Sequence, residues 1–314
     1  MGQRLVRSLL ADTRVSHVLA VDDVPADHAL PFSHAGRLTY LAMDIRKARK
    51  VRELLFGPAR DLNVQVVVHL SEHINSYNTG RGVHEQNVEA LRSILELSDM
   101  HPTIFRLVVK SHAVVYRVGL DLPVQVTEEH PLNLAADAPQ YVRDRVEADL
   151  TACARMGLID CEVVVLRCAE ALAPGIGSQL HDWLDAPFAL RTMGFDPMVN
   201  VASPEDIVHA IELATHGSGE GVFNIPGYDT LPLSEAAHKW GTRLIPMPAS
   251  LIRPIYGFRH WATGSQFRYG INRAQMHLGL VLDGTRARQV LGYVPRHPVQ
   301  WPAGGSLDEP IPAG

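Results

Sequence analysis

Cysteine is scarce in this sequence: the 314 residues include only Cys153, Cys161 and Cys168, and no two of them form a Cys-x-x-Cys pair. An odd number of thiols without paired spacing excludes a disulfide framework and a zinc site built on cysteine pairs. We therefore interpret the three cysteines as buried thiols in a reducing compartment and expect a cytoplasmic protein.

Long apolar runs and clusters of basic residues are also missing. No stretch reaches the roughly 18 apolar residues that a membrane-spanning helix needs, and residues 1–12 lack a signal-peptide core and cleavage pattern. The net charge is −5, from 29 Lys and Arg against 34 Asp and Glu. The sequence thus predicts neither a membrane nor a nucleic acid as partner. With 46% hydrophobic and 20% charged residues, it is typical of a globular protein of one large or two moderate domains.

What the sequence does contain is an alternation of apolar strands with amphipathic helices. Continuous apolar runs are typical of strands buried on both faces of a parallel sheet, and a spacing of three to four residues between apolar positions predicts helices. The pattern therefore favours an α/β protein. The strands are expected at 15–21, 38–43, 64–70, 105–109 and 161–168, and the main helices at 2–11, 84–99 and 139–156.

Tyr141 and Arg145 are the first candidates for chemistry. In a helix they lie at i and i+4 on one face, the spacing at which side chains meet. A guanidinium beside the phenol stabilises phenolate and lowers the pKa of tyrosine from about 10, so we expect Tyr141 to act as a general acid or base near neutral pH. The alternative is a solvated helix face. Upstream, Ser111 and His112 follow a buried strand, at the edge of a parallel sheet where ligands bind.

The order of these features resembles the extended short-chain dehydrogenase/reductase family, the NAD-dependent epimerase/dehydratase group that acts largely on nucleotide sugars. In that family a strand ending in a Ser-Ser-x-x-x-Tyr-Gly pattern precedes a Tyr-x-x-x-Lys helix, and Ser, Tyr and Lys are catalytic. Tyr141 falls on the family tyrosine, Arg145 on the lysine and His112 on the serine, with Ser111 one place early. The resemblance implies that Tyr141 exchanges a proton with the substrate, that Arg145 holds the phenolate, and that His112 or Ser111 polarises the substrate oxygen. Unlike serine, His112 is also expected to titrate near neutrality.

Further matches run from Gly2 to about Pro295, nearly the whole chain. They imply a doubly wound, Rossmann-like parallel sheet that binds NAD, with a smaller C-terminal substrate domain. Asp22 follows a strand and is our candidate for the acid that binds the adenosine ribose. Asn87 is expected to tie its helix to the catalytic strand, or else only to cap that helix. The other positions that the resemblance assigns to the cofactor are Gly2, Asp44, Ile45, His69, Leu70 and Arg167.

One part of the family pattern has no counterpart in this sequence. The family begins with a strand and a Gly-x-x-Gly-x-x-Gly loop, and Gly2 aligns with the last of the three glycines. That strand normally lies in the middle of the sheet, where its removal leaves backbone groups without partners. Because such a gap is costly, we expect a misplaced start or a truncated chain rather than genuine loss. In either case we expect the chain as given to bind NAD weakly, since the loop holds the pyrophosphate.

One string suggests a different chemistry. His69-Leu70-Ser71-Glu72-His73 matches the His-x-x-Glu-His pattern of inverted zinc proteases. That mechanism needs both histidines on one helical face, whereas His69 falls in a strand, where residues i and i+4 are more than about 10 Å apart. We therefore expect no metal site.

The resemblance also divides the chain. An NAD-binding domain is expected at 1–170, with 197–215 returning to it, and a substrate domain with a loose tail at 171–314. Residues 246–277 match the family least; aromatic residues and arginines are interleaved there, which favours either a substrate wall or a small packed helical subdomain. The helices at 84–99 and 139–156 would form the dimer face of the family, or else pack as ordinary core.

The resemblance thus implies an NAD-dependent oxidoreductase or epimerase that acts on a hydroxyl or keto group of a nucleotide-sugar-like or other small substrate. The protein would supply binding, orientation and electrostatics, and the cofactor the hydride chemistry. The alternative is a catalytically impaired relative of the same fold that serves as a binding or scaffold protein. The absent glycine loop, His112 in place of serine and Arg145 in place of lysine favour this alternative, because function resides in the site and not in the fold.

Overall fold

The computed structural model describes residues 1–25 and 36–302, and its largest layer is a parallel sheet. Four strands follow the order β10-β6-β4-β3, and two more, β1 and β2, form a separate parallel pair. The parallel α/β fold predicted from the sequence is therefore confirmed. The bounds are β1 (Val18–Asp22), β2 (Leu38–Ala42), β3 (Val66–His69), β4 (Arg106–His112), β6 (Glu162–Cys168) and β10 (Gly221–Ile225).

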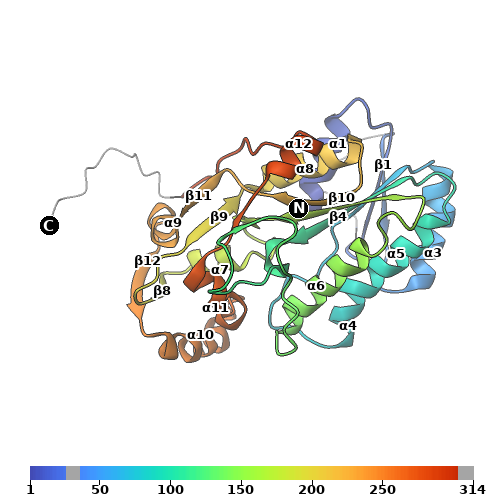
Figure 1. Ribbon diagram of the computed structural model, residues 1–314. Coiled ribbons are helices and arrows are strands. Elements are labelled where there is room, and N and C mark those ends of the chain that lie inside the picture. Colours follow the sequence, from blue (N-terminus) through green and yellow to red (C-terminus); the bar gives the residue numbers. More distant parts are fainter. Residues whose placement is uncertain (26–35, 303–314) are drawn as a thin grey trace.

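Helices cover both faces of this layer (Figure 1). The two faces follow from strand alternation: along β4, Leu107 and Val109 pack into the core on one face and Val108 into the core on the other. The first face is covered by α3 (Ala48–Leu54), η1 (Leu55–Ala59), α4 (Arg81–His84), η2 (Glu85–Glu89), α5 (Ala90–Asp99) and α6 (Gln140–Cys153). The second is covered by α1 (Gly2–Ala11), α8 (Pro204–His216) and α12 (Thr285–Leu291).

A second hydrophobic core lies in the C-terminal part, around the buried side chains of Trp183 and Leu184. Its strands are β7 (Glu170–Ala171), β8 (Phe188–Thr192), β9 (Met198–Ala202), β11 (Asp229–Pro232) and β12 (Arg243–Met247). Its helices are α7 (Gln179–Leu184), α9 (Leu233–Trp240), α10 (Ala249–Thr263) and α11 (Tyr269–Leu278). The remaining elements are η3 (Ala113–Val115), β5 (Gln125–Val126) and β13 (Val281–Leu282). The domain boundaries stay a prediction, and β10 of the main sheet comes from the region expected to form the substrate domain.

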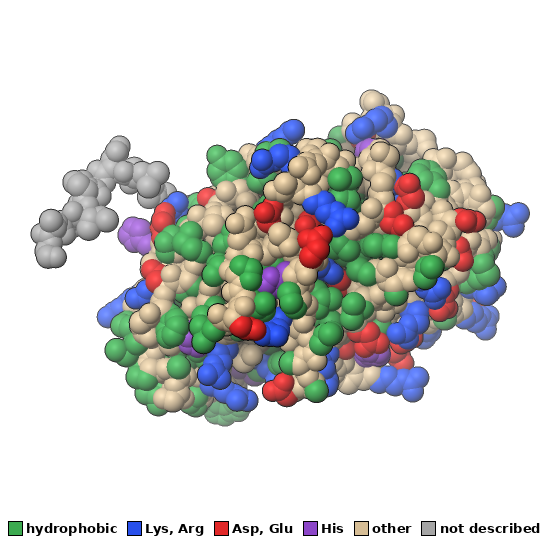
Figure 2. Space-filling model, viewed as in Figure 1, with side chains coloured by type: hydrophobic (Ala, Val, Ile, Leu, Met, Phe, Trp, Pro, Cys, Tyr) green, Lys and Arg blue, Asp and Glu red, His purple; other side chains and the backbone are tan. Residues whose placement is uncertain are grey.

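Residues 246–277 form two helices and not an aromatic-lined wall. Tyr256, Phe267 and Tyr269 are buried in the second core, whereas Phe258 and Trp261 of α10 are exposed. Hydrophobic side chains accordingly gather over the α10 end of the molecule in Figure 2, while acidic and basic side chains are interspersed elsewhere on that face. The aromatic side chains named here thus pack in the second core or lie exposed, while Asn272, Gln275 and Met276 of α11 line a small cavity.

The two helices proposed as a dimer face have apolar sides that are buried within the chain itself. Leu91, Ile94 and Leu95 of α5 and Val142 and Val146 of α6 are all buried. The dimer therefore remains a prediction. None of the helices in residues 1–25 and 36–302 has the length and apolar character that crossing a membrane requires.

A buried ion pair joins α6 to the middle of the sheet. Asp149 of α6 accepts hydrogen bonds from Arg167 of β6, at 2.6 Å from Nη2 and 3.0 Å from Nε, and from Ser111 Oγ of β4 at 2.6 Å. Arg167 also donates to the Tyr116 hydroxyl at 3.1 Å. Both members of the pair are almost fully buried, so each charge depends on the other for its stabilisation.

Removing the carboxylate of this pair should destabilise the fold. We expect Asp149→Ala to lower the free energy of unfolding by about 3 to 5 kcal/mol, because it leaves a buried guanidinium without its counter-charge. Denaturation in urea, followed by far-UV circular dichroism, measures this. The matched control is Glu96→Ala, which removes the carboxylate from the exposed pair with Arg155 and should cost less than about 1 kcal/mol. Equal effects of the two variants would contradict the assignment of Asp149–Arg167 as a structural pair.

Candidate functional site

The candidate residues meet at the carboxyl-terminal edge of the main sheet. β3, β4 and β6 all end there, at His69, His112 and Cys168, and α6 begins close by at Gln140. This is the edge at which open parallel sheets bind ligands.

Tyr141 and Arg145 are in contact, as their spacing predicts. The guanidinium carbon of Arg145 lies 3.5 Å from the centre of the Tyr141 ring, and its Nη1 donates to the Tyr141 carbonyl oxygen at 3.0 Å. The Tyr141 hydroxyl donates to the carbonyl oxygen of Gly177 at 3.4 Å. Both side chains are buried, so the alternative of a solvated helix face is wrong.

Glu72 lies at the centre of a cluster that the sequence analysis did not assign to catalysis. Its carboxylate accepts from Lys110 Nζ at 2.9 Å, from His112 Nε2 at 2.6 Å and from Arg145 Nη2 at 3.1 Å. Burial opposes its ionisation, yet His112, Lys110 and Arg145 together hold the pKa of Glu72 well below its usual range. With His112 neutral, two cations face one carboxylate, and the cluster carries a net positive charge.

The lowered pKa expected for Tyr141 and the titration near neutrality expected for His112 are both wrong. Burial raises the pKa of Tyr141 above its ordinary value, and Arg145 offsets only part of this effect. Burial likewise lowers the pKa of His112 to about 4, although Glu72 acts in the opposite direction. At neutral pH the phenol is therefore protonated and the imidazole uncharged. The buried phenol is a weaker acid than an exposed tyrosine, and His112 does not titrate near neutrality.

Ser111 and Arg167 are held away from this cluster. Side chains alternate along β4, so Ser111 points to the opposite face from Lys110 and His112 and donates to Asp149. Arg167 has its own contacts with Asp149 and Tyr116, and neither residue lines the cavities at this edge. In this structure Ser111 and Arg167 therefore lie apart from the cluster and from both cavities, and of the two residues proposed to polarise a substrate only His112 reaches them.

Asn87 also has a different role from the one expected. Its side-chain oxygen accepts from the His73 backbone N–H at 2.7 Å, and its Nδ2 donates to Asp144 at 3.1 Å. It therefore ties η2 to the segment after β3 and to α6, not to the catalytic strand β4. It lines neither cavity.

A cavity of about 770 Å³ opens between β1 and β3 and extends to the cluster. Six of the residues assigned to the cofactor line it: Gly2, Asp22, Asp44, Ile45, His69 and Leu70. Burial raises the pKa of Asp22 and lowers that of His69 to about 4, whereas Arg46 holds the pKa of Asp44 below its usual range. The structure therefore brings these six residues to one cavity, together with Lys110 and His112.

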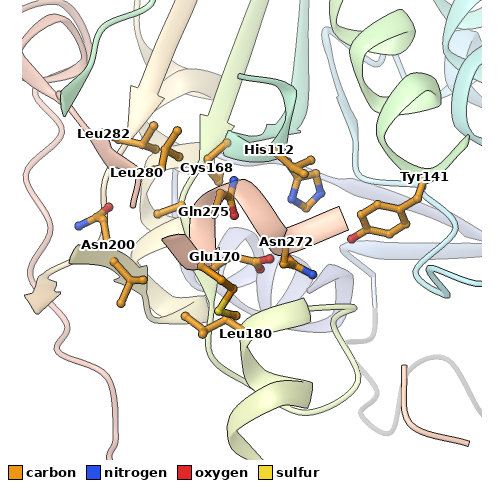
Figure 3. Close-up of a pocket in the computed structure, with 15 residues that line it drawn as sticks. His112, Tyr141, Cys168, Glu170, Leu180, Asn200, Asn272, Gln275, Leu280 and Leu282 are labelled. Carbon is orange, nitrogen blue, oxygen red and sulfur yellow. The ribbon is translucent and has the colours of Figure 1, made fainter. Parts of the chain in front are cut away.

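A second, small cavity of about 50 Å³ lies where the main sheet meets the C-terminal part (Figure 3). Tyr141, His112, Asn272 and Gln275 line it, and Asn200 lies on the side away from Tyr141 in Figure 3. Glu170, between them, lines both cavities. A volume of this size holds only about one or two water molecules.

Glu170 is a titratable residue that the sequence analysis missed. Burial raises its pKa to about 7, although a hydrogen bond from Ser178 favours the charged form. Its position two residues after the buried strand at 161–168 is the signal that could have identified it, as is the position of Glu72 shortly after the strand at 64–70. Lys110 had the same signal, one place before Ser111.

No metal centre is found among the residues that the structure describes: in that part of the chain no three His, Cys, Asp or Glu side chains gather closely enough to hold an ion. His69 lies in strand β3, the conformation on which the sequence analysis based its argument against the zinc-protease pattern.

Comparisons with known proteins agree with this architecture. No family model matches the chain. The uncharacterized protein Rv0501 of Mycobacterium tuberculosis is 27% identical over 307 residues, which cover 94% of this chain and 77% of the relative, and the uncharacterized protein Mb0513 of Mycobacterium bovis is equally similar.

Among solved structures, the dTDP-glucose 4,6-dehydratase of Bacillus anthracis in complex with NAD has a TM-score of 0.67 at 18% identity, covering 94% of this chain and 88% of the other. The UDP-glucuronic acid 4-epimerase of Bacillus cereus in complex with NAD has a TM-score of 0.68 at 13% identity, covering 95% and 90%. This chain therefore has the Rossmann-like fold of these structures.

The raised pKa of Glu170 makes a prediction about stability. The folded state holds its proton up to about pH 7, whereas the unfolded chain releases it near pH 4.3. This contribution to stability is therefore fully present below about pH 4 and is lost as the pH rises from there through 7, by roughly 4 kcal/mol for this group. Glu170→Gln, which cannot ionise, should lack this decrease. Urea denaturation at pH 4.5 and at pH 8 gives the free energy of unfolding of both proteins. The value for the variant minus the value for the wild type should be larger at pH 8 than at pH 4.5. A difference that does not change with pH would contradict the burial of an ionisable Glu170.

Proposed function

We propose that the chain is an NAD-dependent oxidoreductase of the epimerase/dehydratase type, acting on a hydroxyl or keto group of a nucleotide-sugar-like or other small polar substrate. The observation that carries this proposal is the meeting of Tyr141, His112 and Glu170 at one cavity, next to a larger cavity lined by Asp22 and Ile45. The likeness of the fold to two enzymes solved with NAD supports it.

The residues at the larger cavity fit a dinucleotide. The Asp22 carboxylate follows β1, where it can accept hydrogen bonds from ribose hydroxyls, and Ile45 offers an apolar contact for a base. The N-terminus of the ten-residue helix α1, with Gly2, lines the same cavity, and unpaired N–H groups at a helix N-terminus favour phosphate. When bound, NAD supplies the hydride chemistry.

The side chains at the small cavity suit the reduction of a carbonyl group. The protonated Tyr141 phenol gives its proton to the substrate oxygen as that oxygen becomes an alcohol. The net positive charge of the Glu72 cluster favours the negative charge that develops on this oxygen. Glu170, with a pKa of about 7, can take up or release a proton at neutral pH. Asn200, Asn272 and Gln275 offer hydrogen bonds to the hydroxyl groups of a sugar-like substrate.

Substrate binding requires the small cavity to widen. About 50 Å³ does not hold a sugar ring, and α11 contributes Asn272, Gln275 and Met276 to its wall. A displacement of α11 away from β4 would enlarge the cavity without disturbing the Glu72 cluster, whose members come from other elements.

A second candidate is a binding protein without catalysis. Two observations favour it: the Ser111 hydroxyl is hydrogen-bonded to Asp149, and burial raises the pKa of Tyr141, which makes the phenol a weak proton donor. This protein would bind a dinucleotide or a small polar ligand at the same edge but would not turn it over.

Cofactor binding is tested by titrating NADH into the protein and following the fluorescence of NADH. We expect weak but saturable binding, and Asp22→Asn should weaken it about tenfold, because one charged acceptor for ribose hydroxyls is lost. Asp137→Asn changes an exposed aspartate outside both cavities and serves as the control. The absence of saturable binding to the folded protein would overturn the proposed cofactor.

Catalysis is tested by following NADH oxidation with a panel of UDP- and dTDP-linked keto sugars and small ketones. We expect Tyr141→Phe to lower kcat by about 10²- to 10⁴-fold, the usual contribution of a positioned acid or base. Tyr228→Phe, at an exposed tyrosine, is the matched control and should leave kcat unchanged. Full activity of Tyr141→Phe would exclude the assigned proton donor, and NADH binding without turnover of any substrate would favour the binding protein.

A further inference from the structure

One segment of the C-terminal part carries charge of a single sign. Residues 243–282, which include β12, α10 and α11, contain five arginines and no aspartate or glutamate, although the whole chain has a net charge of −5. Within the described residues, the pairs between arginine and carboxylate all involve other arginines. Arg259 and Arg268 instead donate to backbone carbonyl oxygens, each at 3.1 Å. The segment therefore keeps its positive charge.

A row of large apolar side chains runs along one exposed face of α10. Leu251, Phe258 and Trp261 are 49%, 67% and 79% exposed, and Pro254 between them is exposed as well. Steps of three and four residues place these four side chains on one face, over a length of about 15 Å. We call this face the α10 stripe. The helix packs into the second core through a different face, which includes Ile252, so it has two apolar faces and only one is covered.

Positive charge borders the α10 stripe. At about 100° per residue, Arg253 and Arg259 lie on opposite flanks of the stripe. Figure 2 shows basic side chains next to the hydrophobic ones at the α10 end of the molecule. An exposed row of Leu, Phe and Trp with arginines beside it is typical of a helix that lies in a membrane surface. There the aromatic rings reach the level of the lipid headgroups, and the arginines are attracted to anionic lipids.

We propose that the α10 stripe binds the surface of an anionic membrane, with the side chains of Leu251, Phe258 and Trp261 inserted among the lipid headgroups. The expectation that a membrane is not a partner rested on the net charge of the whole chain and on the length of its apolar runs. Neither quantity reveals a local basic segment beside a short apolar face.

A partner protein and a second copy of the chain are poorer occupants of the α10 stripe. A stable protein interface covers about 800 Å² on each partner. One face of a helix about 15 Å long and about 10 Å wide offers far less. Its aromatic side chains also protrude from a convex surface, and α10 lines neither of the two cavities. A lipid surface takes up protruding apolar side chains without a matching pocket.

The proposal is independent of the enzymatic activity and is tested with lipid vesicles. The probes are vesicles of equal parts phosphatidylglycerol and phosphatidylcholine, and vesicles of phosphatidylcholine alone. In co-sedimentation we expect the 314-residue protein to bind the anionic vesicles at least about tenfold more tightly than the neutral ones. Raising the salt concentration from about 0.05 M to about 0.5 M should release it, because salt screens the arginines. No binding to anionic vesicles, or equal binding to both kinds, would overturn the proposal.

A pair of double variants tests the place of binding. Phe258→Gln combined with Trp261→Gln removes most of the apolar surface of the α10 stripe and should weaken vesicle binding at least about tenfold. The matched control replaces Leu120 and Leu134, two exposed leucines outside α10, by Gln and should leave binding unchanged. All four side chains are exposed, so Tm and the NADH titration should stay at their wild-type values. Equal vesicle binding by the two double variants would contradict the assignment of the α10 stripe.

A pair of charge reversals tests the electrostatic part. Arg253→Glu places a negative charge beside the α10 stripe and should weaken binding to anionic vesicles by about tenfold or more. Arg60→Glu makes the same change at an exposed arginine outside residues 243–282 and should have little effect. Equal losses in the two variants would show that only the net charge of the protein matters, which would overturn the proposed site.

Trp261 also reports its own insertion. It is exposed, whereas Trp183 is buried and the other two tryptophans are half-buried. We expect anionic vesicles to shift its fluorescence to shorter wavelength, because the indole leaves water. Trp261→Phe, which keeps an aromatic side chain, should bind the vesicles about as tightly as the wild type but without this shift. A dimer that produces the same shift in the absence of vesicles would assign the α10 stripe to a second copy and overturn the proposal.

Discussion

The pairing of Asp149 with Arg167 is the constraint on which the candidate site depends. It fixes α6 against β4 and β6 in the interior, and Arg145 and Tyr141 lie about one and two turns nearer the start of the same helix. Their positions at the sheet edge are therefore set by a contact that takes no part in chemistry. Asp149 also accepts the hydrogen bond of the Ser111 hydroxyl, which directs this hydroxyl away from the cavities at the sheet edge.

Glu72 then determines the electrostatics of the edge. Two cations and an imidazole surround one carboxylate, and burial determines the protonation of the groups nearby. Desolvation penalises the charged form of every group, so it raises the pKa of Tyr141 and Glu170 and lowers that of His112. A neutral phenol, a neutral imidazole and a half-ionised carboxyl group are the result. Burial thus keeps the Tyr141 phenol protonated at neutral pH and also makes it a weaker acid than an exposed tyrosine.

The sequence predicted most of the fold because its signals are local. The continuous apolar runs at 105–109 and 161–168 correspond to β4 and β6, and the helix expected at 2–11 has the observed bounds. It also predicted the contact between Tyr141 and Arg145, since helical spacing determines proximity. It could not predict the sign of the pKa shift, because spacing does not reveal burial. Glu72 and Lys110 were missed for a similar reason: their contact joins two strand ends separated by almost forty residues, and only the sheet register brings them together.

The separation of β1 and β3 determines the geometry of the cavity between them. Asp22 lies at the end of β1 and Glu72 follows β3, so the distance between these two carboxylates depends on how far apart the two strands are held. Within the described residues, no backbone pairing sets that separation; it is set by side-chain packing of α1 against α8 and of α3 against α5. Side-chain packing of this kind tolerates small shifts more readily than a ladder of backbone hydrogen bonds, which fixes neighbouring strands about 4.8 Å apart. A dinucleotide must contact both ends at once, so part of its binding free energy is spent on fixing this separation. The weak NAD binding that we predict would follow from this cost, while the contacts of Tyr141, Arg145 and Glu72 would stay as they are.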